Sequence, residues 1–164
     1  MSQLQHVYDD GGREAAGFTG KTGDCVTRAI TIASGADYRQ VYDELFQATL
    51  DDRFFMRKLE ARYGENARKH ASPRTGVNRR IYDRYLRDHG WEWTATMGIG
   101  TGCQVHLREG ELPPFGRLIV RLSRHLTTVL DGVIHDTFNP SRDGTRCVYG
   151  YYQPGWNHYT KGRR

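Results

Sequence analysis

One cysteine of the 164-residue chain stands where a nucleophile is often activated. Cys25 follows a stretch of glycines and small polar residues, GKTGD at 20–24, and begins a segment with helical periodicity. A structural cysteine more often lies inside an element, where it fills space as a small apolar side chain. At a helix N-terminus, the free amides and the helix dipole stabilise a thiolate instead. The position of Cys25 therefore predicts a thiol that ionises.

A β-hairpin is predicted in the second half of the chain, within RHLTTVLDGVIHDT at 124–137. Asp131-Gly132 between two apolar, β-branched runs is a leading signal for a two-residue turn of type I′. The turn fixes the register of the two strands, because it decides which residues lie opposite each other. The predicted pairs are Leu130 with Val133, Val129 with Ile134, Thr128 with His135, and Thr127 with Asp136.

This register predicts that His125 and Asp136 meet. Side chains alternate between the two faces of a sheet, so both residues lie on one face and His135 lies on the other. As diagonal neighbours they are roughly 7–8 Å apart at the backbone, a gap that an imidazole and a carboxylate can close to a hydrogen bond. A one-residue slip would put them on opposite faces. The alternative interpretation is that both are ordinary polar residues of a solvated sheet face.

Cys25, His125 and Asp136 together form a complete set for nucleophilic catalysis. An imidazole beside a thiol takes its proton and stabilises the thiolate. A carboxylate on the other imidazole nitrogen fixes the tautomer and the orientation of the ring. The amide of the cysteine, at the start of a helix, is a donor for an oxyanion that forms during acyl transfer.

The elements that must position these residues are predicted from hydrophobic periodicity. Helices come first and strands second, which indicates an α+β domain with an antiparallel sheet. The first helix starts at Cys25, capped by Asp24 or Thr22, and ends at Gly35; the second starts at Asp37. Further helices are predicted at 51–64 and 77–90, and strands at 91–97, 117–122, 125–130, 133–138 and 146–152.

The length of the chain fits a single domain, 1–164, that buries a core of its own. Residues 1–20 are rich in glycine and charge without periodicity, so we expect an N-terminal arm or loop there. Residues 64–76 are predicted as a mobile polar loop, and 160–164 as a basic tail.

The composition indicates a polar but globular protein, with 37% hydrophobic and 12% aromatic residues. No apolar run reaches the roughly 18 residues of a membrane span, and no signal-peptide pattern is present at the start of the sequence. Three well-separated cysteines predict free thiols and a reducing, cytoplasmic setting. Cys147 is expected to pack as a small apolar strand residue, and Cys103 to lie in the tight loop GIGTGC.

The sequence resembles the papain-like cysteine peptidase superfamily in its compact bacterial and phage forms, similar to the C39 and NlpC/P60 groups. The resemblance lies in GDCVTRA at 23–29 and in the hairpin at 124–137, in the order Cys, His, Asp. It implies a papain-like fold in which N-terminal helices pack on a C-terminal antiparallel sheet. By this resemblance Cys25 is the nucleophile, His125 the general base and Asp136 the orienting acid.

One residue of that superfamily's pattern has no counterpart here. A glutamine upstream of the cysteine usually supplies an oxyanion donor, yet residues 15–24 read AAGFTGKTGD. Backbone amides are one substitute. The side chains expected to line the site in its place are Lys21, Thr22, Asp24 and Gln104.

Other functions compete for the same residues. A zinc site from Cys25, His106 and His125 would lack the paired ligand spacing of known sites, so no metal and no cofactor are expected. Nucleic-acid binding is an alternative, because the net charge is +5 and the C-terminal segment from Tyr149 to Tyr159 is aromatic. Arg28 is expected to form a salt bridge, with Asp43 or Glu44 as partner, or to lie near the thiolate.

We therefore expect a thiol hydrolase that cleaves peptide, isopeptide or related amide bonds of a peptide or protein through a thioester intermediate. A transamidase would use the same triad with an amine as acceptor. The alternative from another class is a non-catalytic binding module for nucleic acid or an acidic protein. The sequence does not fix the oligomeric state.

Overall fold

The computed structural model describes residues 2–21 and 23–155. Its helices are α1 (Cys25–Ser34), α2 (Tyr38–Asp51), α3 (Arg53–Tyr63), α4 (Ala67–His70) and α5 (Arg79–Asp88), with short 3-10 helices η1 (Gly64–Asn66) and η2 (Pro73–Thr75). Its strands are β1 (Gln5–Tyr8), β2 (Trp91–Ala95), β3 (Arg117–Leu122), β4 (His125–Leu130), β5 (Val133–Asp136) and β6 (Gly150–Pro154).

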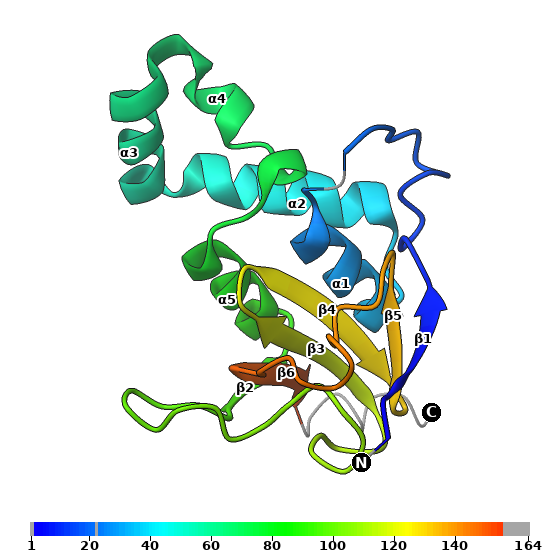
Figure 1. Cartoon of the computed structure of the whole chain (residues 1–164). Coiled ribbons are helices and arrows are strands. Elements are labelled where there is room, and N and C mark those ends of the chain that lie inside the picture. The colour runs from blue at the N-terminus through cyan, green and yellow to red at the C-terminus, as the bar shows by residue number, and fades with distance from the viewer. Residues whose placement is uncertain (1, 22, 156–164) are drawn as a thin grey trace.

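The strands form one mixed sheet in the order β1-β5-β4-β3-β6-β2. α1, α2 and α5 lie along one side of this sheet, whereas α3 and α4 extend away from it (Figure 1). The predicted α+β class is confirmed, as are helices close to the four predicted positions. No helix of the described ranges is long and apolar enough to cross a membrane.

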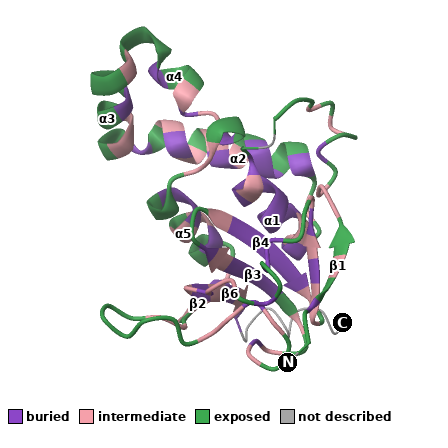
Figure 2. Cartoon of the chain, viewed as in Figure 1, coloured by how far each residue is buried: buried purple, intermediate pink, exposed green. Residues whose placement is uncertain are grey.

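The core holds α1 against the centre of the sheet. Val26, Ala29 and Ile30 of α1 pack with Ile119 of β3 and Leu126 of β4 in one buried cluster. Figure 2 shows α1 and the central strands largely buried, while α3 is mostly exposed. A second cluster covers the opposite face of the sheet; it contains Leu4, Leu107, Leu112, Leu118, Val120, Leu122, Val129, Ile134 and Val148. The sheet is therefore buried on both faces. The packing of α1 against one of these faces holds the helix that begins with Cys25 in place.

The predicted hairpin is confirmed in turn and register. Asp131 and Gly132 have φ of 46° and 80°, the two positive values that a type I′ turn requires. β4 pairs with β5 through Thr128 with His135, Val129 with Ile134, and Leu130 with Val133.

The N-terminal region differs from the predicted arm. β1 pairs in parallel with β5, so the sheet is mixed rather than purely antiparallel. Three of its four residues are exposed and one is half-buried, so no buried alternation marks this edge strand in the sequence. Arg13, in the turns that follow β1, is itself buried. The first 20 residues therefore contribute to the sheet and to the core.

Two other predicted boundaries differ from the structure. The segment 64–76, predicted as a polar loop, contains η1, α4 and η2. The last strand is Gly150–Pro154 rather than 146–152, because Cys147 forms only an isolated bridge with His106. The predicted basic tail at 160–164 lies outside the described residues.

The cysteines also differ from the prediction of free thiols. Cys103 and Cys147 form a disulfide with their Cα atoms 5.8 Å apart, and Cys25 is free. Cys147 is therefore a cross-link and not an apolar filler. It ties the glycine-rich loop after β2 to the segment before β6. Disulfides are typical of oxidising environments, whereas free thiols were the basis for predicting a reducing, cytoplasmic setting. The compartment of the protein therefore stays a prediction.

Candidate active site

Cys25 is the first residue of α1 and is partly buried. The preceding Asp24 occupies the N-cap position, but its side chain accepts no hydrogen bond from the backbone amides of the helix. This corrects the prediction that Asp24 caps α1 through its carboxylate. The sulfur instead lies beside the start of β4, close enough to the His125 side chain and the Leu126 amide for both to lower its pKa.

His125 stands between Cys25 and Asp136. Its Nε2 lies 2.7 Å from Oδ2 of Asp136, so the predicted His–Asp pair is confirmed. Because Nε2 is held by the carboxylate, Nδ1 is the ring nitrogen left for the sulfur. The ring of Phe138 lies 5.0 Å from the imidazole, centroid to centroid, and covers part of it. The imidazole is thus oriented by the carboxylate on one side, with the thiol of Cys25 close to it.

Asp136 accepts hydrogen bonds from other groups besides His125. Thr127 Oγ1 donates to Oδ2 at 2.7 Å, and the backbone amide of Thr137 donates to Oδ1 at 2.7 Å. Burial raises the pKa of Asp136, but the hydrogen bond and charge of His125, together with Thr127 and the Arg28 cation, outweigh it and lower the pKa below 3.8. Asp136 is therefore a carboxylate at neutral pH.

The thiol and the imidazole shift each other in opposite directions. Burial raises the pKa of Cys25, yet the hydrogen bond and positive charge of His125 and the Leu126 amide lower it further than burial raises it. Burial lowers the pKa of His125, but hydrogen bonds and charges of Asp136 and Cys25 raise it to about 9. These directions favour a thiolate–imidazolium pair at neutral pH.

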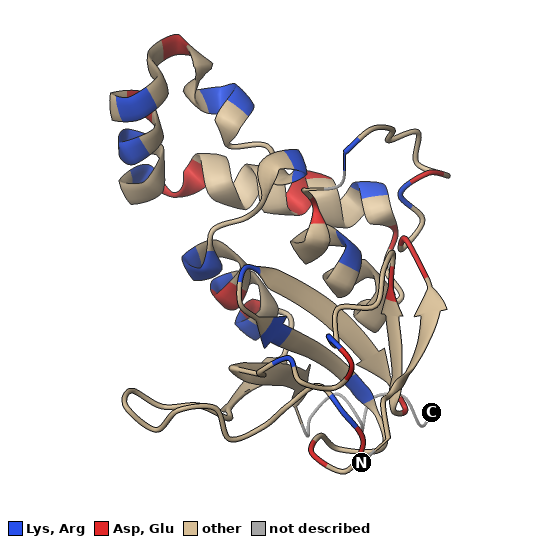
Figure 3. Ribbon diagram, viewed as in Figure 1, with Lys and Arg blue, Asp and Glu red and all other residues tan. Residues whose placement is uncertain are grey.

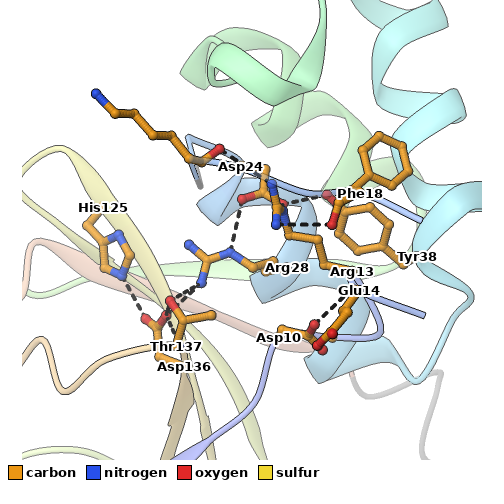
Figure 4. Close-up of polar contacts among 12 residues, drawn as sticks. Asp10, Arg13, Glu14, Phe18, Asp24, Arg28, Tyr38, His125, Asp136 and Thr137 are labelled. Carbon is orange, nitrogen blue, oxygen red and sulfur yellow. Dashed lines mark hydrogen bonds and ion pairs between the residues drawn. The ribbon is translucent and has the colours of Figure 1, made fainter. Parts of the chain in front are cut away.

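Arg28 connects α1, which begins with Cys25, to Asp136 at the end of β5 (Figure 4). Its Nε donates to Asp24 Oδ1 at 3.2 Å, and one terminal nitrogen donates to Asp136 Oδ1 at 2.9 Å and to Thr137 Oγ1 at 2.7 Å. Arg28 is 3% exposed. The predicted salt bridge of Arg28 is confirmed, but its partners are Asp24 and Asp136, not Asp43 or Glu44.

Asp24 has two further partners on the side away from Asp136. Arg13 Nε lies 3.1 Å from Asp24 Oδ2, and the Tyr38 hydroxyl donates to the same oxygen. We call Arg13, Asp24, Arg28 and Asp136 the buried charge cluster. All four residues are less than 9% exposed.

The buried charge cluster balances its own charges. Two arginines compensate two aspartates, so neither aspartate is left as an unpaired buried charge. A thiolate at Cys25 adds one negative charge, and the imidazolium of His125 supplies the matching positive one. The site therefore accommodates the ion pair without a net buried charge.

Cys25 and His125 open onto a cavity of about 440 Å³. Its other lining residues come from α1 and the residue pair before it, from η2 and the segment that follows it, from α5, and from β3, β4 and the turn between them; they are Gly23, Val26, Thr75, Gly76, Val77, Arg79, Tyr82, Arg121, Leu122, Arg124 and Leu126. A bound substrate thus has access to the sulfur from one side, while the other side is packed against the sheet.

Of the four side chains expected to replace the glutamine, the three that the structure describes do not line this cavity. Gln104 lies in the exposed loop that follows β2 and donates to the Thr101 carbonyl. The carboxylate of Asp24 is an acceptor, held by its arginines and by a tyrosine. Lys21 is exposed and is not among the lining residues, and Thr22 lies outside the described residues.

Several residues of the site were not predicted. Arg13, Thr127 as a donor to Asp136, Tyr82 and Phe138 all contact or line it. The spacing of Asp24 and Arg28, four residues apart at a helix start, was a usable signal for their ion pair. The others reach the site only through tertiary packing, which leaves no local pattern.

Among the described residues, His106 of the predicted zinc alternative is not one of the residues that line the Cys25 cavity. His106 lies with Glu111, at 3.1 Å, and near Cys103. No group of three metal-ligating side chains occurs within residues 2–21 and 23–155. Tyr152 of the proposed stacking surface is fully buried, and the rest of that surface beyond residue 155 lies outside the described residues.

Comparisons with protein-family models, with curated proteins and with solved structures each found no significant match.

Proposed function

We propose that this protein is a thiol hydrolase that cleaves peptide, isopeptide or related amide bonds with Cys25, His125 and Asp136, in a papain-like arrangement. The observation that carries the proposal is the position of His125, which hydrogen-bonds Asp136 through Nε2 and lines the same cavity as Cys25, the thiol whose pKa it lowers. A nucleophile, a base and an orienting acid in mutual contact are the components of covalent acyl transfer.

The reaction begins from the ion pair. The thiolate of Cys25 attacks the acyl carbon, and the electrons of the carbonyl bond move to its oxygen. When the tetrahedral intermediate collapses, the imidazolium of His125 gives its proton to the leaving amine, and a thioester remains. Neutral His125 then takes a proton from water as the oxygen attacks the thioester. Release of the acid product leaves Cys25 as thiolate and His125 as imidazolium again.

The negative oxygen of the intermediate needs donors. The amide of Cys25 lies at the start of α1, where backbone amides have no partner within the helix. Tyr82 lines the same cavity, and its hydroxyl has no hydrogen-bond partner among the described residues. We assign these two groups to the role that a glutamine has in papain-like enzymes.

The test is proteolysis of a mixed peptide library, with new termini located by mass spectrometry, for the parent and for Cys25→Ala. We expect new termini with the parent only. A fluorescent primary amine in the same reaction distinguishes the transamidase, which would attach it to acyl groups. If neither variant cleaves or transfers, the protein is the binding module of the alternative function.

A further inference from the structure

Three arginines surround the mouth of the Cys25 cavity. Arg79 is the first residue of α5, Arg121 lies in β3, and Arg124 belongs to the β3–β4 turn next to His125. Arg79 and Arg124 are exposed, and Arg121 is half-buried. Figure 3 shows basic residues at the start of α5, at the end of β3 and at the β3–β4 turn.

These arginines have no acidic partner. None of the three forms an ion pair with a residue of the described ranges, whereas other exposed arginines, such as Arg87 with Asp83, do. No aspartate or glutamate lines the cavity. Three uncompensated cations beside a nucleophile create a positive potential that attracts anionic groups to it.

The positive region extends beyond Cys25. A second cavity of about 440 Å³ shares Arg79 and Arg121 with the first and is otherwise lined by Trp93, Ala95, Met97, Gly98, Ile99, Gly100 and Tyr149. It also lacks an acidic side chain. The two cavities therefore adjoin at a pair of shared arginines, and we call them together the groove.

Two of the arginines are held in place by aromatic rings. The guanidinium of Arg79 lies 5.5 Å from the centroid of the Trp93 ring, and that of Arg121 lies 5.5 Å from the centroid of the Tyr149 ring. Such stacking orders the guanidinium and leaves its N–H groups free for a carboxylate. It also covers ring faces on which nucleic-acid bases would stack, which favours a peptide over a nucleic acid.

We propose that this groove selects acidic peptide segments, with aspartate or glutamate side chains bound by Arg79, Arg121 and Arg124 beside the bond that Cys25 attacks. The proposal rests on the proposed function for the identity of the attacked bond, but the recognition of carboxylates is measurable without any hydrolysis.

The experiment uses two peptide chloromethyl ketones, Ac-Glu-Glu-Gly and Ac-Gln-Gln-Gly, which are isosteric and differ in charge. The Cys25 sulfur displaces chloride from either reagent, and the rate of alkylation is followed by intact mass. With the parent we expect the Glu reagent to react about tenfold faster, because the interactions of its two carboxylates with the arginines together supply about that factor. Because the effect is electrostatic, the ratio should fall in about 1 M salt.

A triple variant, Arg79→Gln, Arg121→Gln and Arg124→Gln, should bring the ratio of the two rates close to one while alkylation by the Gln reagent persists. The matched control is Arg39→Gln, Arg62→Gln and Arg68→Gln, three exposed arginines that also stack on aromatic rings but lie outside the groove. The control should keep the parent ratio. If the triple variant does not fold, Arg124→Gln alone, in an exposed turn, should lower the ratio by part of this amount.

Equal rates with the parent, or an unchanged ratio in the triple variant, would overturn the proposal. So would protection of Cys25 from iodoacetamide by a single-stranded oligonucleotide but not by a polyglutamate peptide, which would assign the groove to nucleic acid. Failure of the proposed function alone would give a different result. The ratio of the two alkylation rates would still depend on Arg79, Arg121 and Arg124, but no peptide of the library would be cleaved.

Discussion

The guanidinium of Arg28 and the carboxylate of Asp136 lie 2.9 Å apart, and they join the helix that begins with the nucleophile to the strand that ends with the acid. Both side chains are almost fully buried. The same guanidinium also holds Asp24, the residue before Cys25. One arginine therefore links the segment that carries the nucleophile to the acid of the triad.

Replacing Arg28 by methionine should destabilise the protein strongly. The substitution keeps the aliphatic volume but leaves Asp24 without its second cation and Asp136 without Arg28. Breaking a buried ion pair in this way costs about 3–5 kcal/mol. The matched control is Arg87→Met, whose ion pair with Asp83 is exposed and should contribute less than about 1 kcal/mol. Urea unfolding of both variants checks this, and equal losses would contradict the structural role of Arg28.

Replacing Asp136 by asparagine should impair chemistry and also lower stability, because it leaves Arg28 with Asp24 as its remaining buried counter-charge. The amide keeps the shape of the side chain but no longer stabilises the imidazolium, and it can favour the wrong tautomer of His125. In a serine protease the same change costs on the order of 10⁴ in kcat. Asp143→Asn, an exposed carboxylate bound to Gln3, serves as the control. Hydrolysis and alkylation rates that match those of the control would remove Asp136 from the triad.

The stability of the protein should depend on pH through His125 and Asp136. The pKa of His125 is raised from 6.5 to about 9, so its stabilising contribution is complete below pH 6.5 and is lost as the pH rises through 9. The pKa of Asp136 is lowered from 3.8, so its contribution is present above that pH and is lost in acid. Urea midpoints measured from pH 3 to 10 should therefore show both losses. His125→Gln should lack the alkaline one, and an alkaline loss of equal size in this variant would refute the assignment.

The disulfide between Cys103 and Cys147 closes a segment of 44 residues. A cross-link over such a loop typically stabilises a protein by about 2–4 kcal/mol. Peptide mapping without reductant should recover the two cysteines in one linked species, and Cys103→Ser with Cys147→Ser should lower the midpoint of thermal unfolding. Cys25 should stay free in the same map. Recovery of Cys103 and Cys147 as separate thiols would exclude the cross-link.

The parts of the site that were predictable depend on local rules. The Asp131-Gly132 turn determines the register, and the register brings Asp136 to His125, so one local signal predicted a contact between two strands. The start of α1 at Cys25 likewise followed from periodicity, and its end followed from the glycine at position 35.

The parts that were not predictable depend on distant segments. β1 pairs with a strand more than 120 residues away and carries no buried alternation of its own, so the N-terminal segment had the pattern of a loop. The partner of Cys147 lies 44 residues upstream, where spacing alone implies no proximity. Arg28 has charged neighbours in sequence on α2, but the fold gives it Asp136 from β5 instead.

The central claim is that Cys25 and His125 form an ion pair, and the pH dependence of Cys25 alkylation by iodoacetamide tests it most directly. Peptide mapping separates this cysteine from the other two. We expect rapid alkylation well below the ordinary thiol pKa of about 8.5, and a shift of the rate profile to higher pH in His125→Ala, because the imidazolium that lowers the thiol pKa is lost. An ordinary thiol profile in the parent, unchanged by the substitution, would contradict the pair and with it the proposed hydrolase.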